Sequence, residues 1–216
     1  DVPPGPDARI DPADFVARVD NPWFPLRPGT VLRYRGSKDG RAAVEVFRVT
    51  RRTKTILGVV TTVVDDRMYL DGRLHERTLD WYAQDRAGTV WYFGEDTAAL
   101  DRSGMVTSRE GSFTAGVDGA SPGIYMPARP KVGQTFQQEY YTGHAEDQFT
   151  VADLAAPVSV PGARSRRSLR TTERTRLEPG VVDAKYYVRG IGTVREVQLA
   201  GPGPRERLEL VSVRRG

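Results

Sequence analysis

The sequence predicts a mainly β protein, an antiparallel sandwich or barrel built from an internally duplicated strand–hairpin unit. Segments rich in Val, Thr, Tyr and Trp alternate with short turn sequences along most of the chain, as in antiparallel β proteins. An aromatic hairpin at residues 81–90 also returns at residues 186–194, with one residue fewer in its turn. Because two hairpins alone are not stable, we expect the two copies to pack together or to close into one barrel.

Five strands are expected in the first half of the chain, at residues 30–35, 43–50, 59–65, 75–84 and 89–94. Asp39-Gly40 and Asp71-Gly72 are typical hairpin turns, and residues 85–88 suit a type I turn with Gly88 in the left-handed conformation. A Gly-rich stretch at residues 104–123 is expected to form a long loop, a kind of segment that often carries function.

A short N-terminal helix is expected after a flexible segment at residues 1–10. Asp11 is a suitable N-cap, Pro12 fits the first helical position, and Asn21-Pro22 ends the pattern. Residues 11–216 are expected to form a single β domain, because no linker of biased composition divides them. Its two pseudo-repeats would cover residues 22–100 and 126–216.

Composition excludes several classes of protein. The 216 residues include no cysteine, so disulfides and thiol chemistry are absent, and no apolar run is long enough for a membrane-spanning helix. The net charge of +4 raises the question of nucleic acid. The distribution argues against it, because basic residues alternate with acidic ones and the one arginine cluster lacks aromatic residues for base stacking. That cluster comprises Arg164, Arg166, Arg167 and Arg170.

The chain starts with Asp1 and a Pro-rich stretch, as expected for the segment that remains after a signal peptide has been removed. We therefore expect an exported protein, extracellular or in the cell envelope. A lipid anchor preceding Asp1 stays open.

The first aromatic hairpin is the predicted site. Alternation along its first strand places Trp81 and Ala83 on one face, and Asp80 and Tyr82 on the other. If Gln84 pairs with Thr89, residues of the second strand join the face of Asp80, whereas a bulge would reverse that assignment. The ligand-binding candidates are Tyr82, Trp91 and Phe93 of this hairpin, Glu110 of the Gly-rich loop that would roof it, and Tyr140.

Catalysis and metal binding have separate candidates. Asp80 and Glu95 are candidate general acids or bases, because burial among aromatic residues raises the pKa of a carboxyl group towards neutrality, and His144 is a further candidate base. Asp96 and Asp118 are candidate Ca²⁺ ligands in loops rich in oxygen donors, although no EF-hand pattern is present. No other cofactor is expected, since Walker, dinucleotide and nucleophile-elbow motifs are missing.

Several motifs resemble a family of bacterial exported proteins, many of them predicted lipoproteins, to which no activity is assigned. The resemblance covers nearly the whole chain from about Asp14 and implies export and a soluble β architecture. It rests on the following stretches: DNPWFPL at 20–26 with PGT at 28–30, DWYAQD at 80–85, VWYFGEDT at 90–97, EGSF at 110–113, AGVDGA at 115–120, PGI at 122–124, MP at 126–127 and QEY at 138–140.

Three functions stay open at this level. The leading hypothesis is an extracytoplasmic β protein that binds an apolar or aromatic small molecule or a cation. The first alternative is an enzyme of cyclase or hydrolase type that uses a buried carboxylate as general acid or base. The second alternative is a structural or envelope-interaction protein.

Overall fold

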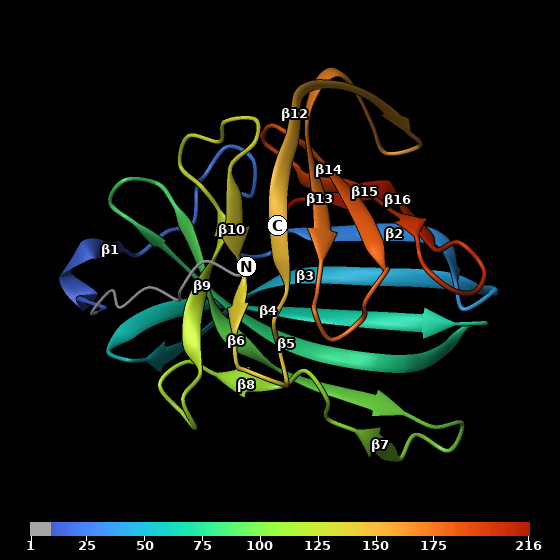
Figure 1. Ribbon diagram of the computed structural model, residues 1–216, viewed down its shortest axis with the longest axis horizontal. Helices are drawn as coiled ribbons and strands as arrows, with labels where there is room; N and C mark the ends of the chain where they lie inside the picture. The colour runs from blue at the N-terminus through green and yellow to red at the C-terminus, as the bar shows by residue number, and fades with distance from the viewer. Residues whose placement is uncertain (1–9) are drawn as a thin grey trace.

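Residues 10–216 form one continuous antiparallel sheet in the computed structural model, which describes this part of the chain (Figure 1). A single 3-10 helix, η1 (Pro12–Asp14), precedes the strands. The strands are β1 (Phe15–Val16), β2 (Val31–Lys38), β3 (Arg41–Ile56), β4 (Val59–Leu70), β5 (Arg73–Asp85), β6 (Val90–Leu100), β7 (Val106–Ser108), β8 (Phe113–Thr114), β9 (Ser121–Met126), β10 (Thr135–Gln137), β11 (Glu139–Tyr140), β12 (Gln148–Val160), β13 (Ala163–Arg174), β14 (Val182–Val188), β15 (Gly192–Ala200) and β16 (Arg207–Arg214).

The sheet curls into a nearly closed barrel. Its order is β10-β12-β13-β14-β15-β16-β2-β3-β4-β5-β6-β9-β11, so the C-terminal strand β16 joins the two halves by pairing with β2. In Figure 1 the blue-to-green strands β2 to β5 run side by side, and the orange-to-red strands continue the same sheet. The two ends of the order meet in the chain itself, because only Gln138 separates β10 from β11. The prediction of a mainly β, antiparallel fold is therefore confirmed, and of the two predicted architectures, sandwich and barrel, the chain adopts the barrel.

The predicted strands and turns of the first half are present. β2 to β6 match the five expected segments, apart from their first residues Thr30 and Thr89, and each strand extends beyond its expected segment. Asp39-Gly40 and Asp71-Gly72 both adopt positive φ, as the tight β2–β3 and β4–β5 hairpins require, and Gly88 has a φ of 96°. These strands are longer than predicted, because charged residues at their ends remain on the solvent face of the barrel wall, where strand pairing does not require apolar side chains.

The N-terminal helix is much shorter than predicted. Asp11 caps it as expected, since its side chain accepts a hydrogen bond from the Ala13 amide, but η1 is a single three-residue turn. Phe15 then enters β1 and pairs with Asp85 of β5. Pairing with a free sheet edge thus replaces further helical turns. The predicted flexible segment falls almost entirely on residues 1–9, which lie outside the described part of the chain.

Residues 19–26 cross one end of the barrel and close it. Gln84 at the end of β5 holds this segment, because its side-chain oxygen accepts hydrogen bonds from the amides of Asp20 (2.9 Å) and Asn21 (2.7 Å). The Gln84 amide nitrogen donates in return to the Asp20 carboxylate at 2.7 Å. Phe24 and Leu26 are buried and face the barrel interior.

The Gly-rich stretch at 104–123 is part of the wall, not the long loop that was predicted. This stretch includes β7, which pairs with the end of β6, and β8, which pairs with the middle of β6. It also includes the start of β9, a strand that pairs with the beginning of β6. Glycines serve the turns between these short strands, as the positive φ of Gly111 and Gly116 shows. The hairpin of β5 and β6 and that of β14 and β15 correspond to the two predicted copies; their origin by duplication stays a prediction.

Candidate functional site

The barrel encloses a cavity of about 250 Å³. Side chains from β2 to β6 form one wall, residues of β14 to β16 form the opposite wall, and Phe24 to Leu26 close one end. The cavity shares four lining residues with a second hollow of about 460 Å³ near the opposite end: Glu45, Met68, Glu196 and Leu208. The interior is therefore an elongated space with one aromatic end and one polar end.

Four aromatic rings form the closed end of the cavity. Tyr82 and Tyr92 are cross-strand partners on β5 and β6, with ring centroids 4.9 Å apart. Tyr125 of β9 lies 4.9 Å from Tyr82, and Phe24 lies 4.4 Å from Tyr125. Such edge and tilted contacts stabilise the cluster and leave electron-rich ring faces at the cavity.

Carboxyl groups line the rest of the cavity wall. Eight of its lining residues are Asp or Glu, and Lys185 is the one basic residue among them. The eight acids are Glu45, Asp66, Glu76, Asp80, Glu95, Glu139, Asp147 and Glu196. Glu196 is the one cavity acid in an ion pair, at 3.8 Å from Lys185, among the residues that the structure describes.

Strand register explains how these acids come together. Asp80 of β5 pairs directly with Glu95 of β6. Asp66 of β4 pairs with Thr78, which lies two residues before Asp80 on β5. On its other side Asp66 pairs with Phe47 of β3, and Glu45 lies two residues before Phe47 on the same face. The acids therefore follow a diagonal across β3 to β6, and Glu139 continues it on β11. We call Glu45, Asp66, Asp80, Glu95 and Glu139 the acidic stripe.

Enclosure raises the pKa of every acid in this stripe. Burial raises the pKa of Glu45 and of Asp80 to about 7 each, and that of Glu139 to about 8. Burial, followed by repulsion from neighbouring acids, raises the pKa of Asp66 and of Glu95 well above the ordinary value. Glu45 and Asp66 are half-buried, so both keep some access to water inside the cavity.

The opposite wall is neutralised by Lys185. Its ammonium group lies 2.8 Å from Glu173 of β13 and 3.8 Å from Glu196 of β15. Burial alone would lower the pKa of Lys185, but these two carboxylates outweigh it and hold the pKa well above its usual value. Lys185 thus stays charged. Its charge also favours ionisation of Glu45, Asp80 and Glu139 across the cavity, but one cation leaves the five acids of the stripe in excess.

The structure brings two of the three predicted catalytic residues together. Asp80, only 8% exposed, accepts a 2.7 Å hydrogen bond from the Tyr92 hydroxyl, and Glu95 is its neighbour on β6. His144 lies elsewhere, exposed in the turn after β11 and stacked on Tyr141 with ring centroids 4.4 Å apart. It does not line the cavity.

The aromatic candidates of the hairpin separate onto two faces. Tyr82 faces the cavity as predicted, whereas Phe93 packs on the outside of the barrel with Trp81 and Phe15, and Trp91 packs beside it. Placing Trp91 and Phe93 with Asp80 was wrong, because Gln84 pairs with Val90 instead of Thr89. A bulge between the Asp80 and Tyr82 pairs then returns Glu95 to the inner face.

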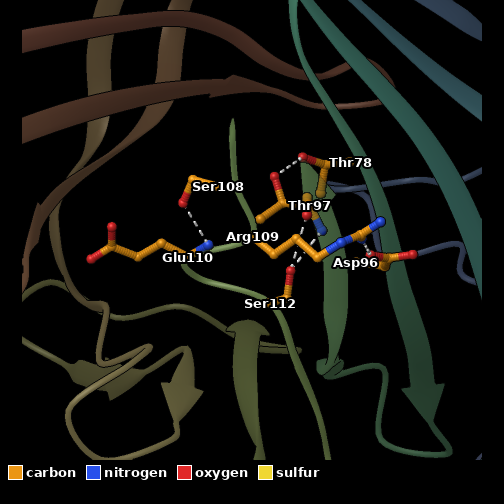
Figure 2. Close-up of polar contacts among 7 residues, drawn as sticks. All are labelled: Thr78, Asp96, Thr97, Ser108, Arg109, Glu110 and Ser112. Carbon is orange, nitrogen blue, oxygen red and sulfur yellow. Dashed lines mark hydrogen bonds and ion pairs between the residues drawn. The ribbon is translucent and has the colours of Figure 1, made fainter. Parts of the chain in front are cut away.

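Glu110 and Tyr140 lie away from the cavity lining. Figure 2 shows Glu110 at the turn between β7 and β8, where its backbone amide donates to the Ser108 hydroxyl at 3.0 Å and its carboxylate extends away from the neighbouring polar groups. Glu110 is exposed on the outer side of the wall, so it does not roof the site. Tyr140 ends the short strand β11 and pairs with Ser121.

The predicted Ca²⁺ ligands lie on the outer surface. Asp96 forms a 2.7 Å ion pair with Arg109, which competes with a metal ion for its carboxylate (Figure 2). Asp118 is exposed in the turn after β8, with a positive φ of 51°. No cluster of three or more His, Cys, Asp or Glu side chains suited to a metal occurs within residues 10–216. Calcium binding stays a prediction.

The sequence reasoning missed Glu45, Asp66 and Glu139. For Glu45 and Asp66, the alternation of side chains along the strands could have indicated an inward-facing position. Glu45 lies on the face of β3 that also carries Ala43 and Phe47, and Asp66 lies between Val64 and Met68 on the inner face of β4. An acid at a position whose neighbours two residues away are buried and apolar points to a polar interior.

The fold is similar to that of a solved structure, a predicted exported protein of Bacteroides fragilis with a YmcC-like fold. The two share 13% identity with a TM-score of 0.52, over 89% of this chain and 99% of that chain. A predicted lipoprotein of Parabacteroides distasonis aligns at 10% identity and a TM-score of 0.46, over 89% and 98% of the respective chains. No protein-family model and no curated protein matches the sequence. The barrel architecture is therefore shared with the Bacteroides protein, and the family resemblance through motifs stays a prediction.

Within residues 10–216, no helix is long and apolar enough to cross a membrane.

Proposed function

We propose that this protein is an exported β-barrel that binds a small molecule in its interior cavity. The observation that carries the proposal is the combination, in one enclosed space, of an aromatic end and a row of carboxyl groups that are not in ion pairs with described residues. Buried polar groups are normally paired, so a site that leaves several of them without a counter-charge is suited to a ligand that supplies one.

The size of the cavity limits the ligand. Small-molecule sites commonly have volumes of about 300 Å³ and more, and the cavity has about 250 Å³ before the hollow at the polar end is added. A compact or narrow ligand fits this space, whereas a large planar cofactor does not. Export is supported by the motif resemblance and by the similar fold of the predicted exported protein from Bacteroides.

A variant with a filled cavity tests the proposal. Met68 lies on the inner face of β4 between Glu45 and Glu76, so Met68→Trp would occupy the cavity. Tyr69→Trp is the matched control, because Tyr69 does not line the cavity. Thermal unfolding is measured for the parent and both variants against small molecules of positive, negative and neutral charge.

We expect cationic and aromatic molecules to raise the melting temperature of the parent and of Tyr69→Trp, but not that of Met68→Trp, since a ligand stabilises only the state that binds it. The proposal is refuted if no molecule stabilises the parent, or if every stabilising molecule acts equally on Met68→Trp.

An enzyme is the second candidate, favoured by one specific observation. Asp80 combines burial, a pKa of about 7 and a hydrogen bond from Tyr92, which suits a general acid or base near neutral pH. Incubation of each stabilising molecule with the parent and with Asp80→Asn, followed by mass spectrometry, separates the two functions. Conversion by the parent alone supports catalysis, whereas unchanged recovery from both supports binding.

A further inference from the structure

We propose that the ligand of the interior cavity is a linear aliphatic polyamine, whose ammonium groups lie along the acidic stripe and whose methylenes pack against the tyrosine cluster. This inference rests on the proposed function and names the chemical class of its ligand.

The arrangement of charge favours an extended cation over a metal ion. The stripe runs diagonally from Glu45 on β3 through Asp66 and Asp80 to Glu95 on β6. Adjacent strands lie about 4.8 Å apart, so this row spans about 14 Å or more. A metal ion needs several ligands converging on one point, and no such cluster occurs in the described chain. A row of charges instead matches a chain of ammonium groups separated by short runs of methylenes.

The balance of charge favours a cationic ligand, because a nearby cation stabilises the ionised form of each carboxyl group. Lys185 is a single cation that is already in ion pairs with Glu173 and Glu196 on the opposite wall, so it offsets the charge of the stripe only in part. An anionic ligand would add repulsion to an already acidic space, and a neutral one would leave the carboxyl groups without counter-charge. A polyamine supplies several positive charges and several N–H donors to groups that accept hydrogen bonds.

Gln138 provides an independent sign of a missing partner. It sits at the seam between β10 and β11, is 5% exposed and lines the cavity beside Glu139. Its amide nitrogen has no hydrogen-bond partner among the described residues. One carboxyl oxygen of Asp66 in the stripe is likewise buried without a hydrogen-bond partner among the described residues, and this acceptor suits an ammonium group.

The aromatic end suits the apolar part of the same ligand. Tyr82, Tyr92 and Tyr125 surround the cavity next to Asp80, so an ammonium group there meets both a carboxylate and aromatic rings. The hollow at the other end continues the space past Glu45 and Glu196. A flexible chain can extend from the aromatic end into this continuation.

Calorimetric titration with spermidine at neutral pH and moderate salt tests the proposal. Hexane-1,6-diol serves as a neutral chain, hexylamine as a single charge and Mg²⁺ as a compact dication. The variants are Asp66→Asn and Glu45→Gln in the stripe, together with Met68→Trp. The control is Asp71→Asn, an acid of the exposed β4–β5 turn. Thermal unfolding of each free variant verifies that it is folded.

We expect one spermidine per chain, bound at least tenfold more tightly than hexylamine, the diol or Mg²⁺. Each stripe variant should weaken spermidine binding by about tenfold or more, because it removes one charged partner. Met68→Trp should abolish binding and Asp71→Asn should leave it unchanged.

Equal weakening by Asp71→Asn and the stripe variants would mean non-specific surface attraction and would overturn the proposal. So would equal binding of the diol. If neutral or aromatic molecules stabilise the parent but not Met68→Trp while spermidine does not bind, the ligand class is wrong and the interior site stands. If nothing distinguishes the parent from Met68→Trp, both proposals fail.

Discussion

Replacing Asp80 by Asn should stabilise the ligand-free protein at alkaline pH. Burial places the pKa of Asp80 at about 7, whereas an aspartate in an unfolded chain titrates near 4. A pKa difference of about three corresponds to roughly 4 kcal/mol between the two protonation states. Because the folded pKa is the higher one, this contribution to stability is fully present below about pH 4 and is lost as the pH rises through 7.

The amide of Asn removes the charge and keeps the contact. Its oxygen can still accept the hydrogen bond that the Tyr92 hydroxyl now donates to Asp80 at 2.7 Å. At pH 8.5 we expect a free energy of unfolding about 2–4 kcal/mol above that of the parent, and little difference at pH 4. The lower end of this range reflects Glu95, since removing one charge eases the ionisation of its neighbour.

Urea denaturation at pH 4, 6 and 8.5 measures the effect. The control is Asp71→Asn, the same substitution in an exposed turn where Arg41 lowers the pKa of the carboxyl group. It should show no gain at alkaline pH. The reasoning is refuted if the stability of the parent does not fall between pH 4 and 8.5, or if Asp80→Asn changes stability equally at every pH.

Three further substitutions test the fold around the site, each by urea denaturation. Gly94→Ala should destabilise by about 2 kcal/mol or more, because Gly94 has a φ of 122° and an added Cβ would overlap the β8 backbone; a near-neutral result would show that the bulge adapts. Gln84→Ala should cost about 1–3 kcal/mol by leaving the Asn21 amide without its acceptor, and equal stability would mean that residues 19–26 are held by packing alone. Lys185→Met should cost about 3–5 kcal/mol at pH 8.5 by leaving Glu173 unpaired, and the double variant with Glu173→Gln should recover most of it; no recovery would show that Lys185 acts mainly through packing.

The sequence by itself determined the local structure and part of the site. Alternation in the first aromatic hairpin separated Trp81 from Asp80 and Tyr82, and the structure places Trp81 outside and the other two inside the barrel. The Asp-Gly turns were equally readable, since few sequences other than these adopt two successive residues of positive φ. Such features depend on neighbours along the chain.

Only the tertiary structure decided which groups share the cavity. The pairing of Gln84 with Val90 places Phe93 outside, and a bulge further along β6 returns Glu95 to the inside; both depend on the register with β5. Glu45 and Asp66 join Asp80 because β3, β4 and β5 are in a particular register, and Lys185 faces them because the barrel closes. Their raised pKa values have the same origin, since burial of an acid is a property of the whole enclosure and not of its sequence neighbours.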